Sequence, residues 1–173
     1  NLYKPMPGYR FIASNTDRSR YYVGELNGKS SKQAYMDALH ISESNIINQT
    51  FHNPLGKMNG QDICIISLKE VSGNGLCCYR QVNDSDVLVL LEEQDYNEIL
   101  DETLQRIRRD FNHISGVFSI NCVFRYLLFS QEHHMEDYLK TMSTLGEHAG
   151  LIGFGEHYNQ QFVNQTMTCV VFE

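Results

Sequence analysis

Residues 150–173 place many polar side chains between two apolar runs. The segment reads GLIGFGEHYNQQFVNQTMTCVVFE, and its ends, GLIGF and TMTCVVF, predict buried strands. Glu156, Asn164 and Gln165 stand between these ends, together with further amide side chains. A hairpin needs only a short turn at that point. The extra polarity therefore indicates either a solvated loop or a segment that contacts a ligand.

A second polar feature interrupts the apolar run FSINCVFR, residues 118–125. If this run is a strand, Asn121 and Arg125 lie on the same face, because strand side chains alternate. An arginine at the end of such a run needs a carboxylate or phosphate partner, and Glu156 is one candidate. Two interpretations stay open at this point. The pair can fix the last hairpin to the central strand, or it can form the rim of a ligand pocket.

The sequence carries no motif typical of a catalytic or metal site. It contains no Gly-x-Ser-x-Gly elbow, no P-loop, no His-Glu-x-x-His and no zinc-finger spacing. The segment Gly153-Phe154-Gly155 is too short for a dinucleotide fingerprint. The five cysteines include no Cys-x-x-Cys pair and lie in strand-like runs, which favours buried thiols in a reducing compartment. We therefore expect a protein that is not an enzyme and holds no metal.

The charge balance also excludes some partners. Lys and Arg number 14 and Asp and Glu number 21, which gives a formal net charge of −7. A nucleic-acid or anionic-membrane partner needs a basic patch, so we expect neither. No apolar run is long enough for a transmembrane helix, and we expect a cytoplasmic location.

The elements expected in the first half of the chain form a hairpin, two helices and three strands. The hairpin covers residues 8–26 with its turn at 15–19, and a helix follows the Asn27-Gly28 turn with Ser30 or Ser31 as its N-cap. A short helix after Ser42 leads to a loop at residues 52–56. The three strands are expected at residues 62–71, 76–82 and 87–93, joined by short turns and therefore paired antiparallel.

The second half predicts two helices and a central strand. The clearest helix starts at a cap on Asp95, ends near His113, and has an apolar stripe that includes Leu104 and Ile107. The run at 116–129 predicts a long strand inside the sheet, and a helix is expected from about 130 to 145. The predicted class is α+β, with a mostly antiparallel sheet, several packed helices and a single domain.

Five short motifs, in order, resemble the C-terminal half of the FIST sensory module. The resemblance covers residues 21–172, so the whole chain, 1–173, reads as one FIST-C-like domain without its N-terminal half. One departure from the family pattern is Asn27, which stands where Asp is usual. Another is a shorter connection between the elements GF and GE. The motifs are NGKSSKQAY (27–35), PLG (54–56), FSINCVFR (118–125), GFGE (153–156) and VNQT (163–166).

The resemblance implies a cytoplasmic sensory domain in signal transduction that binds an amino-acid-like small molecule. The partners it implies are the N-terminal FIST half and a signalling output domain or kinase. Under this reading Arg125 binds the carboxylate of the ligand and Glu156 binds its ammonium group. Asn121, Asn164, Gln165 and Thr166 supply hydrogen bonds, and Phe154 shapes a wall.

Two other readings of the same resemblance stay open. The chain can be a structural or protein-interaction half of a sensor, whose polar residues satisfy backbone groups at a strand junction. It can also be a haem-binding gas sensor, for which His148 and His157 are the candidate ligands. We expect no cofactor, and haem would be present only under the second of these readings.

Overall fold

The computed structural model describes residues 1–60, 62–158 and 161–173. The chain forms two compact units. The N-terminal unit is Tyr3–Glu93, and the C-terminal unit combines Asn1–Leu2 with Gln94–Glu173. Both units combine helices with largely antiparallel sheet, which confirms the predicted α+β class. No helix among the described residues has the length and apolar content needed to cross a membrane.

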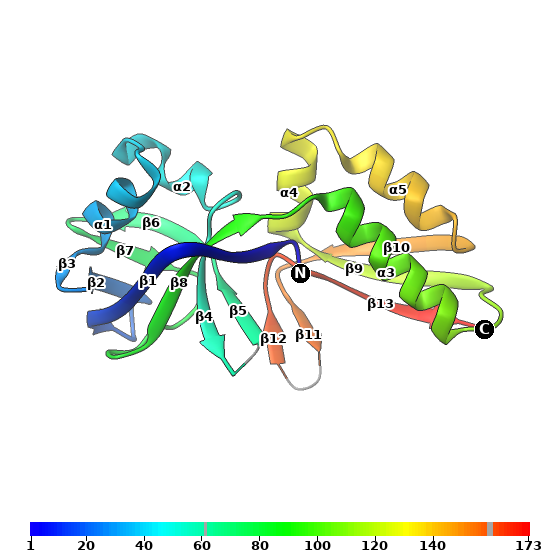
Figure 1. The fold of residues 1–173 in the computed structure, drawn as a ribbon, viewed down its shortest axis with the longest axis horizontal. Helices are drawn as coiled ribbons and strands as arrows, with labels where there is room; N and C mark the ends of the chain where they lie inside the picture. Colours follow the sequence, from blue (N-terminus) through cyan, green and yellow to red (C-terminus); the bar gives the residue numbers. More distant parts are fainter. Residues whose placement is uncertain (61, 159–160) are drawn as a thin grey trace. The chain divides into compact units, whose positions relative to one another are not determined.

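The N-terminal unit is built on an eight-stranded antiparallel sheet. The strand order is β5-β4-β8-β1-β2-β7-β6, and β3 pairs with β2. Helices α1 and α2 lie on one side of this sheet (Figure 1). The elements are β1 (Tyr3–Asp17), β2 (Tyr22–Leu26), β3 (Lys29–Ser30), α1 (Ser31–Leu39), the 3₁₀ turn η1 (Glu43–Asn45), α2 (Ile46–Gln49), β4 (Leu55–Asn59), β5 (Asp62–Ile66), β6 (Leu68–Ser72), β7 (Gly75–Cys78) and β8 (Val87–Glu93).

Local signals placed most of these elements correctly. The predicted hairpin is β1 and β2, and the Ser30 hydroxyl accepts a hydrogen bond from the Gln33 backbone N–H as the N-cap of α1. The loop expected at 52–56 is wrong at its end, because Leu55 already begins β4. Pro54 lies just before that strand, where its missing N–H removes no ladder bond. The predicted pairing of β7 with β8 is also wrong, because β1 and β2 lie between them.

The C-terminal unit combines a three-stranded sheet, a separate hairpin and three helices among its described residues. The sheet order is β10-β9-β13, and β11 pairs with β12. The central place of β9 confirms the expectation of an internal strand, but β9 and β10 run parallel rather than antiparallel. The elements are α3 (Tyr96–Asp110), β9 (Gly116–Cys122), α4 (Val123–Gln131), α5 (Met135–Ser143), β10 (Glu147–Gly153), β11 (Glu156–Tyr158), β12 (Gln161–Val163) and β13 (Met167–Phe172).

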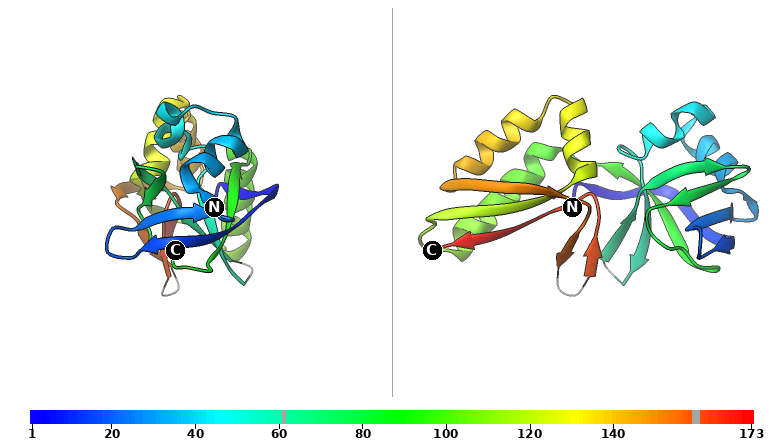
Figure 2. Two further views of the ribbon diagram at one scale, coloured as in Figure 1. Left: turned by 90° about the vertical axis from the view of Figure 1, so that its left-hand side faces the viewer. Right: turned by 180° about the vertical axis from the view of Figure 1, so that it is seen from behind.

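Helix α3 buries the apolar stripe that the sequence predicted. Asp95 caps the helix by accepting hydrogen bonds from the backbone N–H groups of Asn97 and Glu98, and Leu104 and Ile107 are buried. Figure 1 shows α3 in front of the three strands, and Figure 2 shows the strands in front of α3, so the helix covers one face. The opposite face is open, and Val170 on it is about half exposed.

The long strand predicted over residues 116–129 is wrong beyond Cys122. The strand stops there, and α4 begins at Val123. A continuous apolar run has the same pattern in a buried strand and a buried helix, so the pattern could not separate them. Arg125, Leu128 and Phe129 are buried at helical spacing.

The helix expected over residues 130–145 is also corrected, because it is divided between two helices. Helix α4 ends at Gln131, and α5 begins at Met135. Between them, His133 adopts a left-handed backbone conformation with φ 55°, which an α-helix does not tolerate.

Candidate functional site

The junction between β9 and α4 positions Asn121 and Arg125. Both side chains are buried, and Arg125 is 4% exposed. The Arg125 guanidinium carbon lies 4.6 Å from the ring centroid of Phe129 and 5.5 Å from that of Tyr138. Such stacking on aromatic faces stabilises a cation that is withdrawn from water. Because the chain changes from strand to helix after Cys122, the Arg125 side chain stacks on aromatic rings of α4 and α5.

Glu156, the first residue of β11, is the second buried charge of the unit. It is 3% exposed, and its Oε2 accepts a 2.6 Å hydrogen bond from the Thr166 hydroxyl. Its Oε1 is buried and accepts no hydrogen bond from the described residues. Burial raises the pKa of Glu156 to about 7, although the Thr166 hydrogen bond and the charge of Arg125 act in the opposite direction. Desolvation thus outweighs the attraction of Arg125.

Arg125 and Glu156 interact electrostatically. The positive charge of Arg125 acts to lower the pKa of Glu156, but burial has the larger effect and raises it. A direct bidentate pair would hold the carboxyl pKa well below its usual range. The arrangement leaves Glu156 able to accept a further hydrogen bond at Oε1.

The VNQT segment approaches the same junction from the other side. The Cys122 backbone N–H donates a 3.1 Å hydrogen bond to the Thr166 carbonyl, which ties the end of β9 to this segment. Burial raises the pKa of the Cys122 thiol, and the negative charge of Glu156 acts in the same direction. Asn164 and Gln165 are both buried. The segment therefore closes over the end of the central strand.

Gly155 makes the tight approach of the hairpin possible. Its backbone has φ +131°, a region that favours glycine. A Cβ atom at this position would collide with the ring of Phe162 and lie 3.0 Å from Asn164 Oδ1. The shortened connection between the GF and GE motifs is thus accommodated by a glycine that brings β12 close to the start of β11.

Most of the predicted site residues lie in this unit's interior, and one does not. Phe154 is 91% exposed and cannot form the wall of a pocket in this conformation. The remaining residues are buried or half-buried: Asn121, Arg125, Glu156, Asn164, Gln165 and Thr166. Tyr138 contacts both Asn121 and Arg125, and Glu156 is hydrogen-bonded to Thr166. We call this set the polar cluster.

Sequence reasoning missed the aromatic side chains that support the polar cluster. Tyr138 accepts a 2.9 Å hydrogen bond from the Asn121 amide nitrogen and places its ring under Arg125. The ring of Phe129 lies 5.7 Å from that of Tyr138. Tyr138 and Met142 form the buried face of α5 at helical spacing, and this pattern was the signal that could have identified Tyr138.

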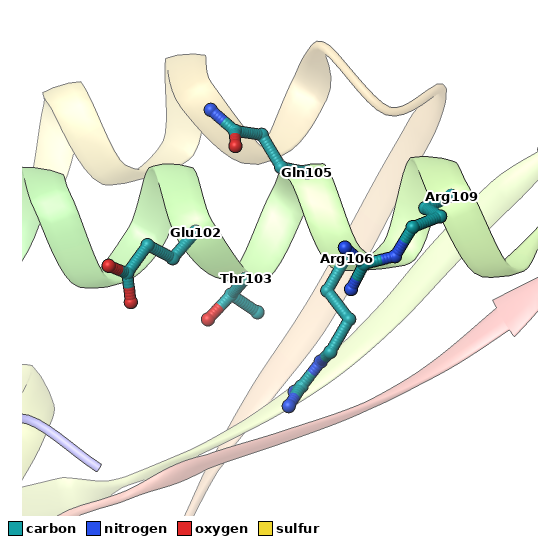
Figure 3. Close-up of a pocket in the computed structure, with 5 residues that line it drawn as sticks. All are labelled: Glu102, Thr103, Gln105, Arg106 and Arg109. Carbon is teal, nitrogen blue, oxygen red and sulfur yellow. The ribbon is translucent and has the colours of Figure 1, made fainter.

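A separate hollow of about 330 Å³ lies along the exposed side of α3. Figure 3 shows the side chains around it, which all come from this helix: Glu102, Thr103, Gln105, Arg106 and Arg109. None of them is a predicted site residue. Neighbouring Arg108 donates a 2.7 Å hydrogen bond to the Thr144 hydroxyl. These arginines lie toward the C-terminal end of α3, where the helix dipole favours positive charge.

Comparison with known proteins identifies the family. A family model described as the FIST C domain matches residues 32–159. Neither the comparison with curated proteins nor that with solved structures found a match. The matched span includes the PLG, FSINCVFR and GFGE motifs, whereas VNQT lies beyond it. That the whole of 1–173 is one such domain stays a prediction. The chain belongs to the FIST C domain family, a sensory-type domain associated with signal transduction.

Proposed function

We propose that this domain binds a small amino-acid-like metabolite at the polar cluster and passes the signal to a linked output domain. The observation that carries the proposal is the Oε1 atom of Glu156, which is buried without a hydrogen-bond donor among the described residues. A ligand ammonium group would supply that donor and offset the cost of burying the carboxylate. Arg125, close enough to influence the pKa of Glu156, carries the charge that a ligand carboxylate needs.

The proposed contacts follow the chemistry of each side chain. The planar guanidinium of Arg125 presents paired N–H donors to a carboxylate, while the Phe129 and Tyr138 rings fix its plane. Thr166 already orients Glu156 by donating to Oε2, so Oε1 is left to receive the ammonium. Asn164 and Gln165 contribute amide groups that can donate and accept in the same buried region.

Access to the polar cluster requires movement of the β11–β12 hairpin. Arg125 and Glu156 are both nearly fully buried, so a ligand reaches them only when a covering segment opens. The hairpin forms its own two-stranded sheet, and Glu156 is its first residue. Isolated two-stranded hairpins have marginal stability in water. Ligand pairing with Glu156 would therefore stabilise a closed hairpin, and this change in stability is the proposed signal.

The test is a calorimetric titration of the purified chain with a panel of amino acids between pH 6 and pH 8.5. Only the ionised form of Glu156 attracts an ammonium group, so affinity should rise through pH 7 and then level off. The matched control is, for each amino acid, the carboxylic acid with the same carbon chain and no amine. Its affinity should be weaker and should not rise with pH. Equal binding of both ligands, or no binding of any amino acid, would contradict the proposal.

The other parts of the proposal concern cellular context. We propose a cytoplasmic binding domain without catalytic activity, whose partners are an N-terminal FIST half and an output domain or kinase. The geometry does not favour the haem alternative: His148 Nε2 is 2.9 Å from the Ser119 hydroxyl and hydrogen-bonded to it, and His157 is exposed on β11. No nucleic-acid or membrane partner is proposed for a chain with a net charge of −7.

A further inference from the structure

A cavity of about 350 Å³ lies in the C-terminal unit, lined by residues of β9, β10, α4 and α5. Arg125 and Glu156 do not line it, and Asn121 is the one predicted site residue that does. Ligand sites in proteins are typically hollows of this size or larger, with apolar walls and a few polar groups. The lining fits that description, so this cavity is a candidate ligand site.

The polar wall of the cavity is a hydrogen-bond chain with a fixed direction. Asn121 Nδ2 can only donate, and it donates to the Tyr138 hydroxyl oxygen at 2.9 Å. Tyr138 in turn donates to the Ser119 hydroxyl oxygen at 3.3 Å. The Ser119 oxygen also accepts from Asn121 Nδ2 at 3.4 Å, which uses its second lone pair, so its own proton is directed to His148 Nε2, 2.9 Å away. His148 therefore accepts at Nε2 and is neutral, in agreement with burial that lowers the pKa of His148.

Because the hydrogen bonds run in this direction, the polar wall of the cavity keeps oxygen atoms that can accept a hydrogen bond from a ligand. Asn121 Oδ1 receives no hydrogen bond from the described residues, and this oxygen is not fully buried. Tyr138 uses its proton toward Ser119 and keeps an oxygen lone pair. No lining residue carries a formal charge, because His148 is neutral. A ligand here is favoured if it is uncharged and donates a hydrogen bond.

The remaining walls are apolar and incompletely covered. Leu139 of α5 and Leu151 and Ile152 of β10 line the cavity, and each is close to half exposed. An apolar ligand body would remove this surface from water at about 25 cal/mol per Å². Gly150 makes room beside the polar wall, since a Cβ atom there would lie 2.6 Å from the Ser119 hydroxyl oxygen.

We propose that this cavity is a second binding site, for a neutral small molecule with an apolar body and a hydrogen-bond-donating head. The head donates to Asn121 Oδ1 and the Tyr138 oxygen, and the body lies against Leu139, Leu151 and Ile152. The site goes beyond the proposed amino-acid site and does not depend on it. Two residues belong to both: Asn121 is part of the polar cluster, and the Tyr138 ring also supports Arg125.

The experiment uses phenol as the probe and follows backbone amide shifts of the full chain by NMR titration. Phenol should shift amides of β9, β10 and α5. Anisole has the same ring without an O–H donor, and it should bind about tenfold more weakly, the worth of one hydrogen bond. Benzoate, which is charged, should not bind at this site. Equal affinities for phenol and anisole, shifts confined to other elements, or no phenol binding would overturn the proposal.

A pair of variants locates the site independently. Leu139→Trp places a large side chain at the mouth of the cavity and should abolish the phenol shifts. Leu127→Trp on α4 is the matched control, because Leu127 is 38% exposed against 46% for Leu139 and does not line the cavity. It should bind phenol like the unaltered chain. Retention of phenol binding in Leu139→Trp, with an unchanged fold, would show that the site lies elsewhere.

Discussion

The two units of this chain differ in which polar groups they bury. In the N-terminal unit the buried polar side chains among the described residues are hydroxyls, and two serve the backbone: Ser31 donates to the Val23 carbonyl, and Thr50 accepts from the Leu68 N–H. The C-terminal unit buries a guanidinium, a carboxylate and several amides. Hydroxyls that form hydrogen bonds with backbone groups are ordinary in a protein core and do not indicate a binding site.

Buried charges are costly, and they are retained where they serve function or specificity. The N-terminal unit therefore has an apolar core, whereas the C-terminal unit holds the proposed binding site among its buried residues. The N-terminal core is one apolar cluster that includes Leu88, Leu90 and Tyr35. Predictions can test this contrast by altering each unit in turn.

The largest expected effect is in the N-terminal core. Leu88 is fully buried, and Leu88→Ala should lower the free energy of unfolding of this unit by about 3–5 kcal/mol, because it removes apolar contacts and leaves a cavity. Native-state amide hydrogen exchange reports the two units separately. A loss below about 1 kcal/mol in the slowest-exchanging amides of β1 and β8 would contradict this description of the core.

Ile107→Ala applies the same change to the C-terminal unit. Ile107 belongs to the buried stripe of α3 but is 7% exposed, so the expected loss is about 2–4 kcal/mol, at the lower part of the range for such substitutions. Amide exchange in α3 and β9 measures it. A change near zero would place the packing face of α3 elsewhere.

Glu156 should make the stability of the C-terminal unit fall as pH rises. Its folded pKa of about 7 lies above the ordinary glutamate value of 4.5, so the folded state binds more protons between these two pH values. Stability from the protonated carboxyl is therefore complete below about pH 4.5 and lost by about pH 7, with a loss of about 1–3 kcal/mol. Glu156→Gln should remove this dependence.

The same variant distinguishes a ligand site from a structural clamp. With burial as the dominant effect, Glu156→Gln should be at least as stable as the unaltered chain at pH 8, since it carries no buried charge. Urea unfolding at pH 5 and pH 8 measures the difference, and titration of other groups cancels between the two proteins. Strong destabilisation by Gln at pH 8 would favour a clamp formed by Arg125 and Glu156.

The smallest expected effect is that of Phe154. Its side chain is 91% exposed, so Phe154→Ala should change the free energy of unfolding by less than about 0.5 kcal/mol. Thermal melting checks this value, and Ile107→Ala serves as the buried counterpart. A loss well above 1 kcal/mol would mean that Phe154 is covered in solution.

Local signals in the sequence predicted the elements well where one residue decides the conformation. Ser30 and Asp95 have short side chains that accept backbone hydrogen bonds, and both cap helices as expected. The end of β9 has no such residue. Cys122 occupies the N-cap position of α4 without a side-chain hydrogen bond, so no capping residue marks the end of the strand.

The candidate site was only partly predictable for a related reason. Charged and amide residues in apolar surroundings stand out in a sequence, and this identified Arg125 and Glu156. Their supporting groups do not stand out, because Tyr138 reads as an ordinary core residue of α5. Its contacts with Asn121 and Arg125 join residues that are distant along the chain, and only the fold brings them together.

Arg125→Met tests the central claim that the polar cluster binds a ligand. Melting temperature and amino-acid affinity should be measured on the same variant at pH 8, with Arg125→Lys as the charge-retaining control. We predict an affinity loss of about thirtyfold to several thousandfold, because a bidentate, charge-assisted contact is removed, with a melting temperature close to that of the unaltered chain. Lys should recover part of the affinity. A large fall in melting temperature with unchanged affinity would contradict the ligand site and leave Arg125 as a structural partner of Glu156.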